Sequence, residues 1–186
     1  PVPVIRKVGI IGAGQMGNGI AHVVALAGYD VTINDLKKEA FEKAVSTIQK
    51  NMTRQVSRGL IKEDDMQGAM RRITFAPALT DLGTCDLVIE AATEDESIKR
   101  RIFTDLRDKV KKGAILASNT SSISITRLAS TTVEPERFIG IHFMNPVPVM
   151  KLVEVIRGIA TEEPTFLAIQ ALAERLGKTT AVSEDF

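Results

Sequence analysis

The sequence predicts an α/β fold of the Rossmann type, with a doubly wound, mostly parallel sheet. Short apolar runs typical of buried strands alternate with amphipathic helical segments, which is the pattern of βαβ units. The first apolar run leads directly into Gly12-Ala13-Gly14-Gln15-Met16-Gly17, a glycine turn that opens a helix. The segment between the second and third strands is long enough for two helices, which predicts a helical-hairpin insertion after the second strand.

The remaining elements follow from the same patterns. We expect strands within residues 6–11, 29–35, 72–79, 85–92, 114–119, 137–144 and 149–158, and a last extended segment over 179–186. We expect helices from the glycine turn to Gly28, over 36–71 with a break at Gly59, and within 97–113, 120–130 and 161–178, since glycine readily ends a helix. Because no repeat or low-complexity tract interrupts the pattern, residues 1–186 are expected to form a single domain.

Composition excludes several classes of function. The 24 basic and 23 acidic residues give a net charge of +1, so no general attraction to nucleic acid or to a membrane surface is expected. No apolar run reaches the ~18 residues that a membrane helix needs. A single cysteine, Cys85, cannot form a disulfide within the chain, and we expect it to be a small buried residue at a strand start. A reducing, cytoplasmic setting fits this composition best.

The glycine turn has the context of a dinucleotide site. Gly12 permits a tight turn, Gly14 lets the backbone approach a pyrophosphate, and Gly17 allows the helix to pack closely. The next strand ends at Asp35, whose carboxylate suits the two hydroxyls of an adenosine ribose and repels a 2′-phosphate. We therefore predict NAD rather than NADP as cofactor, although Lys37 and Lys38 weaken that preference. The alternative is a glycine turn without a ligand.

The long crossover after the second strand is rich in cations. Residues 37–62 hold seven basic and two acidic side chains. The cations that recur every four residues are Lys50, Arg54, Arg58 and Lys62. They share one face if the helix runs that far, and that face suits a ligand rich in phosphates. The ordinary alternative is a solvated face, partly neutralised by the acids at 63–65.

Polar residues gather where the predicted strands end, which is where open α/β sheets bind ligands. They are Glu90 and Glu94 after the fourth strand, Asn119, Thr120, Ser121 and Ser122 after the fifth, and His142 and Asn145 in or after the sixth. Each has an ordinary interpretation as well. Asn119 or Ser121 could cap the next helix, Glu94 could be an exposed loop acid, and Lys99 could be solvated. His22 lies mid-helix and is expected to be structural, and no metal site is predicted.

His142 and Glu154 stand out because each interrupts an apolar strand. A buried glutamate needs a partner, and a histidine on the strand joined to it by the turn "NPVP" can supply one. Such a pair holds one imidazole tautomer and stabilises the imidazolium, which suits a general base beside a redox cofactor. We expect the apolar strands to keep water away from the pair and to strengthen its coupling.

Four segments carry a family resemblance. "GAGQMGNGIA", "EAATEDESIK", "SNTSSISI" and "GIHFMNPVPVMKLVEV" together resemble the L-3-hydroxyacyl-CoA dehydrogenases, including the 3-hydroxybutyryl-CoA dehydrogenases of bacteria. The resemblance covers essentially the whole chain, and the last segment is its most specific part. It implies an NAD-dependent oxidoreductase that interconverts L-3-hydroxyacyl-CoA and 3-ketoacyl-CoA by hydride transfer, with short-chain 3-hydroxybutyryl-CoA as the expected substrate and fatty acid metabolism (beta-oxidation) among the expected pathways.

The resemblance also implies roles for residues. His142 is the expected catalytic base and Glu154 its partner, and Asn145 supports the site. Residues 12–17, Asp35, Glu94, Lys99, Asn119 and Ser121 are expected to bind the cofactor, and Ser121 also touches the substrate. The CoA contacts fall on Asn51, where the family carries a serine, and on Arg58, with Arg54 on the same cationic face.

The family further implies an all-helical C-terminal domain, absent from this chain, which forms a homodimer and supplies one more asparagine to the site. Two alternatives stay open. The chain could act as an NAD-binding module with little activity of its own, or it could belong to a related dehydrogenase of a non-CoA hydroxy substrate.

Overall fold

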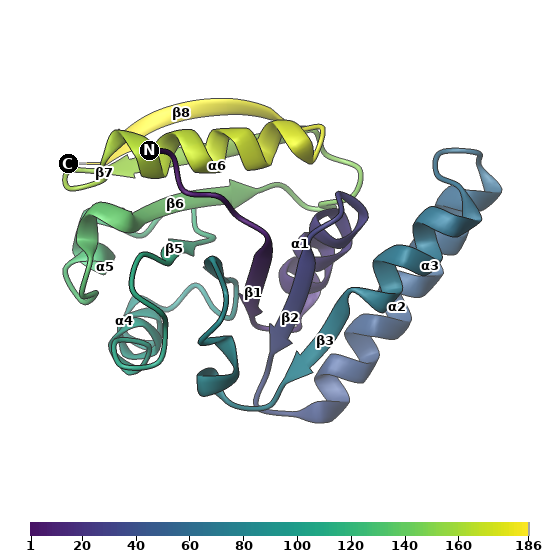
Figure 1. Cartoon of the computed structure of the whole chain (residues 1–186), viewed down its shortest axis with the longest axis horizontal. Coiled ribbons are helices and arrows are strands. Elements are labelled where there is room, and N and C mark those ends of the chain that lie inside the picture. Colours follow the sequence, from purple (N-terminus) through teal and green to yellow (C-terminus); the bar gives the residue numbers. More distant parts are fainter. Residues whose placement is uncertain (186) are drawn as a thin grey trace.

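The predicted strands form one sheet in the computed structural model, which describes residues 1–185 (Figure 1). Its strand order is β3-β2-β1-β4-β5-β6-β7-β8. The strands are β1 (Lys7–Ile11), β2 (Asp30–Asn34), β3 (Ile73–Ala76), β4 (Leu87–Glu90), β5 (Ile115–Ser118), β6 (Phe138–Phe143), β7 (Leu152–Gly158) and β8 (Thr179–Asp185). The last extended segment is thus a strand up to Asp185, and Phe186 lies outside the described residues.

The helices alternate with the strands as predicted. They are α1 (Gln15–Leu26), α2 (Lys38–Ser57), α3 (Glu63–Arg71), α4 (Glu96–Asp105), α5 (Ile125–Ala129) and α6 (Glu163–Arg175), with short 3₁₀ turns at Leu79–Leu82 and Pro135–Arg137. Helix α4 is shorter than the predicted 97–113 segment because the chain turns after Asp105. No helix within residues 1–185 is both long and apolar enough to cross a bilayer.

The mostly parallel, doubly wound sheet is confirmed. All neighbouring strands pair in parallel except β6 and β7, which pair antiparallel. Strand β1 lies between β2 and β4, so the strand order reverses beside it. Ligands of such sheets bind at this reversal, outside the carboxyl ends of the strands. The glycine turn that follows β1 therefore stands at the position that the topology favours for a ligand.

Each face of the sheet has its own apolar core. One core joins residues of α1, α2, α3 and α6 to strand residues such as Val8, Val31, Ile89 and Val155. The other joins α4 and α5 to the opposite side chains of the same strands, with Phe103 edge-on to Phe138. This burial on both faces explains why the inner strands are continuous apolar runs.

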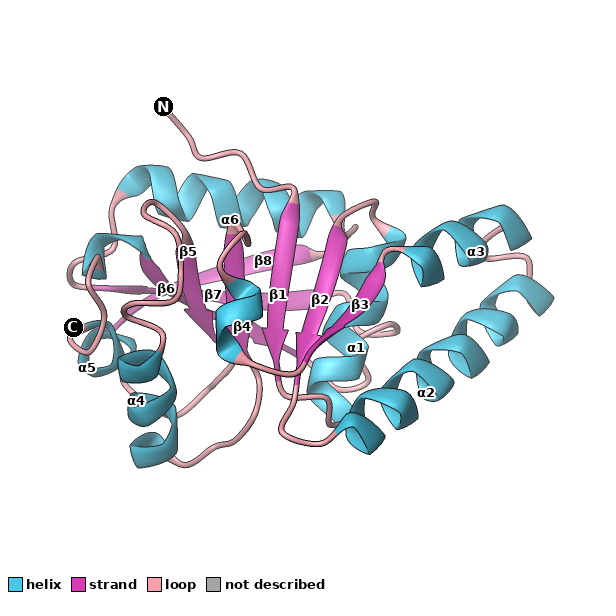
Figure 2. Cartoon of the chain, turned by 60° about the horizontal axis from the view of Figure 1, so that its bottom comes forward, coloured by secondary structure: helices cyan, strands magenta, loops and turns pink. Residues whose placement is uncertain are grey.

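The helical-hairpin insertion is confirmed, and α2 and α3 extend beside β3 at one end of the molecule, away from α4 and α5 (Figures 1 and 2). Helix α2 ends at Ser57, and Gly59 takes a φ of +72° in the turn that follows. The amide of Leu60 reaches back to the carbonyl of Gln55, which closes the helix end. The helix therefore does not run far enough for Lys62 to share the face of Lys50 and Arg54, because Lys62 lies beyond the turn, at the start of α3.

Candidate functional site

The glycine turn is shaped by contacts that exclude side chains. Gly12 has a φ of +105°, and a Cβ built on it would lie 2.7 Å from the Cα of Ala92. A Cβ on Gly17 would lie 1.7 Å from the carbonyl oxygen of Gly12. These two positions hold the turn against β4 and bring the start of α1 close beneath it. The tight turn expected at Gly12 and the close helix packing expected at Gly17 are thus visible in the structure.

The N-terminus of α1 is open to a ligand. Gly14 is the N-cap, no side chain caps the helix, and the first turn carries no acid. A Cβ on Gly14 would meet nothing within 4 Å, so its backbone can be approached closely. The first amides of a helix lack partners within the helix and favour an anion, so this end fits a pyrophosphate.

A pocket of about 1010 Å³ extends from this helix end between α2 and α4. Its lining includes Gly12, Gly14, Asp35, Lys43, Ala92 and Arg101. The Asp35 carboxylate accepts the amide of Ala13 through Oδ2 at 3.0 Å and the amide of Lys37 through Oδ1 at 3.1 Å. Each oxygen keeps a further lone pair for a ligand hydroxyl. The pocket has the size of a nucleotide site and offers the carboxylate that an adenosine ribose requires.

His142 and Glu154 face each other across the β6–β7 pair. The antiparallel register sets the two residues directly opposite, and His142 Nδ1 lies 3.1 Å from Glu154 Oε1. The contact predicted from the turn is therefore present. The expectation that apolar strands shield the pair is wrong for this chain, because 22% of the His142 side chain and 40% of the Glu154 side chain are exposed. The pair lies on a sheet face that the described residues leave partly open.

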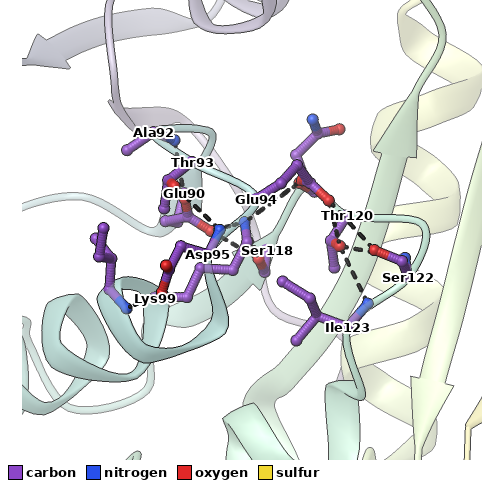
Figure 3. Close-up of polar contacts among 12 residues, drawn as sticks. Glu90, Ala92, Thr93, Glu94, Asp95, Lys99, Ser118, Thr120, Ser122 and Ile123 are labelled. Atoms are coloured by element: carbon purple, nitrogen blue, oxygen red, sulfur yellow. Dashed lines mark hydrogen bonds and ion pairs between the residues drawn. The ribbon is translucent and has the colours of Figure 1, made fainter.

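The loop after β5 is tied to the loop after β4 by Glu94. Its Oε2 accepts the hydroxyl of Thr120 at 3.1 Å and that of Ser122 at 3.5 Å (Figure 3). Thr120 Oγ1 in turn accepts the amides of Ser122 and Ile123, both at 3.3 Å. Ser121 lies exposed between these anchored neighbours. Glu94, although mostly exposed, thus shapes the loop that presents Ser121.

The N-cap of α5, the helix after this loop, is neither of the two residues expected from the sequence. Ser124, rather than Asn119 or Ser121, is the N-cap of α5, and its side chain accepts the amide of Arg127 at 3.1 Å. Asn119 is buried, and its Oδ1 accepts the amide of Phe143 at 2.9 Å. The side chain of Asn119 therefore fastens the end of β5 to β6, next to His142.

Lys99 is fully buried, so its interpretation as a solvated lysine is wrong. Its Nζ lies 2.5 Å from Glu90 Oε1 and 3.0 Å from Ser118 Oγ, and these side chains converge in Figure 3. Glu90 and Ser118 are themselves buried and adjacent in the β4–β5 register. Lys99 thus lies beneath the loops predicted to carry the site.

Asn145 links the part of the candidate site around His142 to the glycine turn. Its Oδ1 accepts a hydrogen bond from Gln15 Nε2 at 3.2 Å, so the segment after β6 contacts the glycine turn. Val147, two residues further on, packs against Gly19 of α1, where an added Cβ would lie 2.9 Å from the valine side chain. The residues around His142 are therefore positioned against the helix that follows the glycine turn.

The cationic residues of α2 form a separate surface. Arg54 Nη1 lies 3.4 Å from Asn51 Oδ1, and Arg58 follows directly as the C-cap of the helix. An open concavity of about 640 Å³ adjoins Arg54, and its other lining residues are Ser46, Gln49, Lys50, Thr53 and Ser57. The structure does not bring these cations into the pocket beside the glycine turn.

Several features of the site could not be predicted from the sequence. Lys43 and Arg101 line the pocket, and the Gln15–Asn145 contact joins residues 130 positions apart. No local pattern signals such contacts, because they depend on how α2, α4 and the β6–β7 turn are folded over the sheet. The burial of Lys99 had one available signal, since Glu90 ends an apolar strand and needs a cationic partner nearby.

Comparisons with known proteins agree on one family. The family model described as the NAD binding domain of 3-hydroxyacyl-CoA dehydrogenase matches residues 7–186. A 3-hydroxybutyryl-CoA dehydrogenase of Bradyrhizobium diazoefficiens is 58% identical over 98% of this chain and 62% of its own length. A probable 3-hydroxybutyryl-CoA dehydrogenase of Deinococcus radiodurans is 47% identical over 97% of this chain and 64% of its own length.

A solved structure shows the same relationship in three dimensions. The crystal structure of (S)-3-hydroxybutyryl-CoA dehydrogenase from Ralstonia eutropha superposes with a TM-score of 0.95 at 44% identity, covering 98% of this chain and 65% of that one. The chain therefore spans slightly less than two thirds of the length of these relatives. The glycine turn, the open helix end and the Asp35 carboxylate fit the cofactor that the family model names. By this match and these identities, the chain belongs to the NAD-binding domain family of the 3-hydroxyacyl-CoA dehydrogenases.

Proposed function

We propose that the full-length protein is an NAD-dependent oxidoreductase that interconverts L-3-hydroxyacyl-CoA and 3-ketoacyl-CoA, with short-chain 3-hydroxybutyryl-CoA as substrate. The observation that carries this proposal is the His142–Glu154 contact, which sets an oriented imidazole on the sheet that also holds the glycine turn. The names of the relatives support the substrate class, since all three relatives reported above are named for 3-hydroxybutyryl-CoA.

In this proposal His142 is the general base. With Nδ1–H donated to Glu154, the lone pair of Nε2 is free to take the proton of the substrate C3 hydroxyl. The Glu154 carboxylate keeps the ring in this tautomer and stabilises the imidazolium that forms. NAD, when bound, supplies the acceptor for the hydride that leaves C3. Ser121 hydrogen-bonds the substrate oxygen, and Asn145 supports the site from the end of β6.

The cofactor lies, in this proposal, along the pocket beside the glycine turn. Residues 12–17 hold the pyrophosphate at the start of α1, and Asp35 takes the ribose hydroxyls. Glu94, Lys99, Asn119 and Ser121 belong to the nicotinamide end. They converge on the carboxyl ends of β4 and β5, beside the strand that carries His142.

The cationic face of α2 is the proposed CoA contact. Asn51, Arg54 and Arg58 lie together at the end of the helix, next to an open concavity lined by hydroxyl and amide side chains. Cations suit the phosphates of CoA. The asparagine at position 51 retains an acceptor and donor where the family carries a serine.

We propose a further C-terminal domain that covers the His142–Glu154 pair in the full-length protein, which the exposure of this pair and the greater length of the relatives support. That this domain forms a homodimer is implied by the family resemblance. We also propose a cytoplasmic location and a part in fatty acid metabolism, including beta-oxidation, as the family resemblance implies.

Oxidation of NADH by acetoacetyl-CoA, followed at 340 nm with the full-length protein, tests this function. We expect turnover with acetoacetyl-CoA and none with acetoacetate or other small keto acids that lack CoA. Turnover of the free acids alone would instead support a dehydrogenase of non-CoA substrates. Tight NADH binding without turnover of any of them would support an NAD-binding module.

A further inference from the structure

A buried hydrogen bond joins α1 to the end of α2 that carries the cations. His22 of α1 is only 1% exposed, and its Nε2 lies 2.8 Å from Oε1 of Gln55 on α2. Because a glutamine Oε1 can only accept, His22 carries its proton on Nε2 and donates it. The other ring nitrogen, Nδ1, is buried and has no hydrogen-bond partner among residues 1–185. Within this part of the chain, the His22 ring thus makes its hydrogen bond to Gln55 alone.

This hydrogen bond lies at the end of an apolar contact between the two helices. Ile48 and Met52 of α2 are fully buried in the same core as Ile20 of α1, and α2 lies beside α1 (Figure 2). Gln55 follows Met52 by three residues, so it lies on the same face of α2. Apolar contacts have no preferred direction, whereas a hydrogen bond depends on distance and angle. The bond between His22 and Gln55 therefore fixes where along α1 the end of α2 lies.

Gln55 also belongs to the backbone that carries the proposed CoA contacts. Its carbonyl oxygen accepts the amide of Leu60 at 2.9 Å, and the carbonyl oxygen of Arg54 accepts the amide of Arg58 at 3.1 Å. Arg54 directly precedes Gln55, and Arg58 follows it by three residues. Both arginines are exposed, so the position of their guanidinium groups depends on the backbone beneath them. The side chain of Gln55 ties this backbone to α1.

Helix α1 is also the element against which the rest of the candidate site is placed. Its open N-terminus at Gly14 is the proposed pyrophosphate site, and Gln15 in its first turn contacts Asn145 at the end of β6. The same helix therefore contacts the cofactor side of the site, the segment after His142 and, through His22, the end of α2. The position of α2 on α1 determines how far the cations lie from the reacting groups.

We infer that His22 and Gln55 are positioning residues, which set the cationic face of α2 at the distance from the cofactor site that a CoA thioester spans. The inference rests on the proposed function and adds two residues to it. Neither residue lines the concavity beside Arg54 or the pocket beside the glycine turn, so both act through the placement of α2. When the hydrogen bond is lost, the end of α2 is free to shift, and the phosphates and the thioester of one CoA molecule no longer fit their contacts together.

Gln55→Ala in the full-length protein tests this placement, because alanine removes the acceptor and is a strong helix former. We expect KM for acetoacetyl-CoA to rise about threefold to tenfold with little change in kcat, the pattern of lost binding that is uniform along the reaction. Acetoacetyl-pantetheine lacks the phosphates of CoA, so its KM should stay at the wild-type value. The matched control is Gln67→Ala on α3, since Gln67 contacts only its own helix, through Glu63 at 3.3 Å. The control should retain both KM values.

Variants of His22 test the other partner of the hydrogen bond. His22→Leu removes the donor and should raise KM for acetoacetyl-CoA as Gln55→Ala does, whereas His22→Gln keeps an N–H donor and should stay close to wild type. Combining His22→Leu with Gln55→Ala should raise KM no further than either change alone, because both remove one contact. A wild-type KM for acetoacetyl-CoA in folded Gln55→Ala would overturn the inference, and so would an equal rise in KM for acetoacetyl-pantetheine.

Hydrogen exchange gives a readout that does not depend on turnover. The amides of Arg58, Gly59 and Leu60 donate to carbonyl oxygens in the last turn of α2. We expect them to exchange faster in Gln55→Ala than in wild type, and at the wild-type rate in Gln67→Ala. Unchanged exchange in Gln55→Ala would overturn the inference. If the unmodified protein does not reduce acetoacetyl-CoA, the proposed function fails, and the exchange result alone still decides whether the His22–Gln55 bond holds the end of α2.

Discussion

His142 on β6 and Glu154 on β7 are direct partners in the antiparallel register, with 3.1 Å between Nδ1 and Oε1. Side chains alternate between the two faces of a strand, so a slip of one residue would move Glu154 to the other face. The turn between the strands is fixed by Val147 against α1 and by Lys178, whose Nζ lies 2.6 Å from the carbonyl oxygens of both Val147 and Met150. The contact between His142 and Glu154 is therefore a consequence of strand pairing.

Glu154→Gln should keep the shape of this pair and remove its charge. The imidazolium loses its counter-charge, so kcat/KM is expected to fall by about tenfold or more. The loss should be equal for oxidation of 3-hydroxybutyryl-CoA and for reduction of acetoacetyl-CoA at one pH, because the equilibrium constant of the reaction is fixed. Steady-state kinetics in both directions measure it, and wild-type values in the variant would show that the carboxylate plays no part.

The cations of α2 should govern affinity for CoA. Arg54→Glu/Arg58→Glu is expected to raise KM for acetoacetyl-CoA by about tenfold or more, because the two proposed phosphate contacts would become repulsive. The KM for NADH should stay unchanged, since these residues lie outside the pocket beside the glycine turn. Arg107→Glu/Lys112→Glu makes the same change of charge on an exposed segment after α4 and serves as control. An unchanged KM in the first variant would refute the CoA contact.

His22 should make the protein less stable in mild acid. Burial lowers its pKa from the usual 6.5, against the hydrogen bond that His22 Nε2 donates to Gln55 Oε1 and with a further contribution from the charge of Lys178. Below about pH 6.5 the unfolded chain therefore binds a proton that the folded chain does not, and the free energy of unfolding falls as pH decreases toward the folded pKa. Above that pH the contribution of His22 is present in full.

Urea denaturation of wild type and His22→Gln between about pH 7.5 and pH 5 measures this effect. The variant should lose less of its free energy of unfolding over this range than wild type does. Carboxylates that titrate in the same range are common to both proteins and cancel in the difference. Equal losses would mean that His22 takes up its proton in the folded state as readily as in the unfolded chain.

Cys85 should be inert toward alkylation. Burial raises the pKa of its thiol to about 11, with Lys7 and Lys111 opposing the shift and Asp86 adding to it. Its sulfur is fully buried, and a Cβ on Gly9 would lie 3.0 Å away from it. Only a small fraction of the thiol is ionised near pH 8, so native protein should resist iodoacetamide and unfolded protein should react. Rapid labelling of the native chain would contradict this burial.

Much of the fold follows from sequence because its signals are local. Apolar runs, the helix end at Gly28 and the break at Gly59 depend on residues close to one another in the chain. The contact between His142 and Glu154 was also predictable, since a short turn joins the two strands. These elements agree with the structure because local preference and global packing favour the same answer.

The features of the fold and site that the sequence did not predict depend on tertiary packing. The burial of Lys99, the cap at Ser124 and the exposure of the acid–base pair are each set by segments distant in sequence. Lys99 shows this best, because its helix is rich in exposed cations and only the approach of β4 and β5 distinguishes it from them. The exposure of Glu154 likewise depends on which segments cover the face of β7 that carries its side chain.

Single-turnover reduction of acetoacetyl-CoA by NADH tests the proposed role of His142 as the base of a hydride transfer. His142→Gln in the full-length protein should slow this step by ~10²–10⁴-fold. Its NADH dissociation constant should stay unchanged, because no residue of the glycine turn is altered. A single-turnover rate equal to that of wild type would show that His142 is not the base.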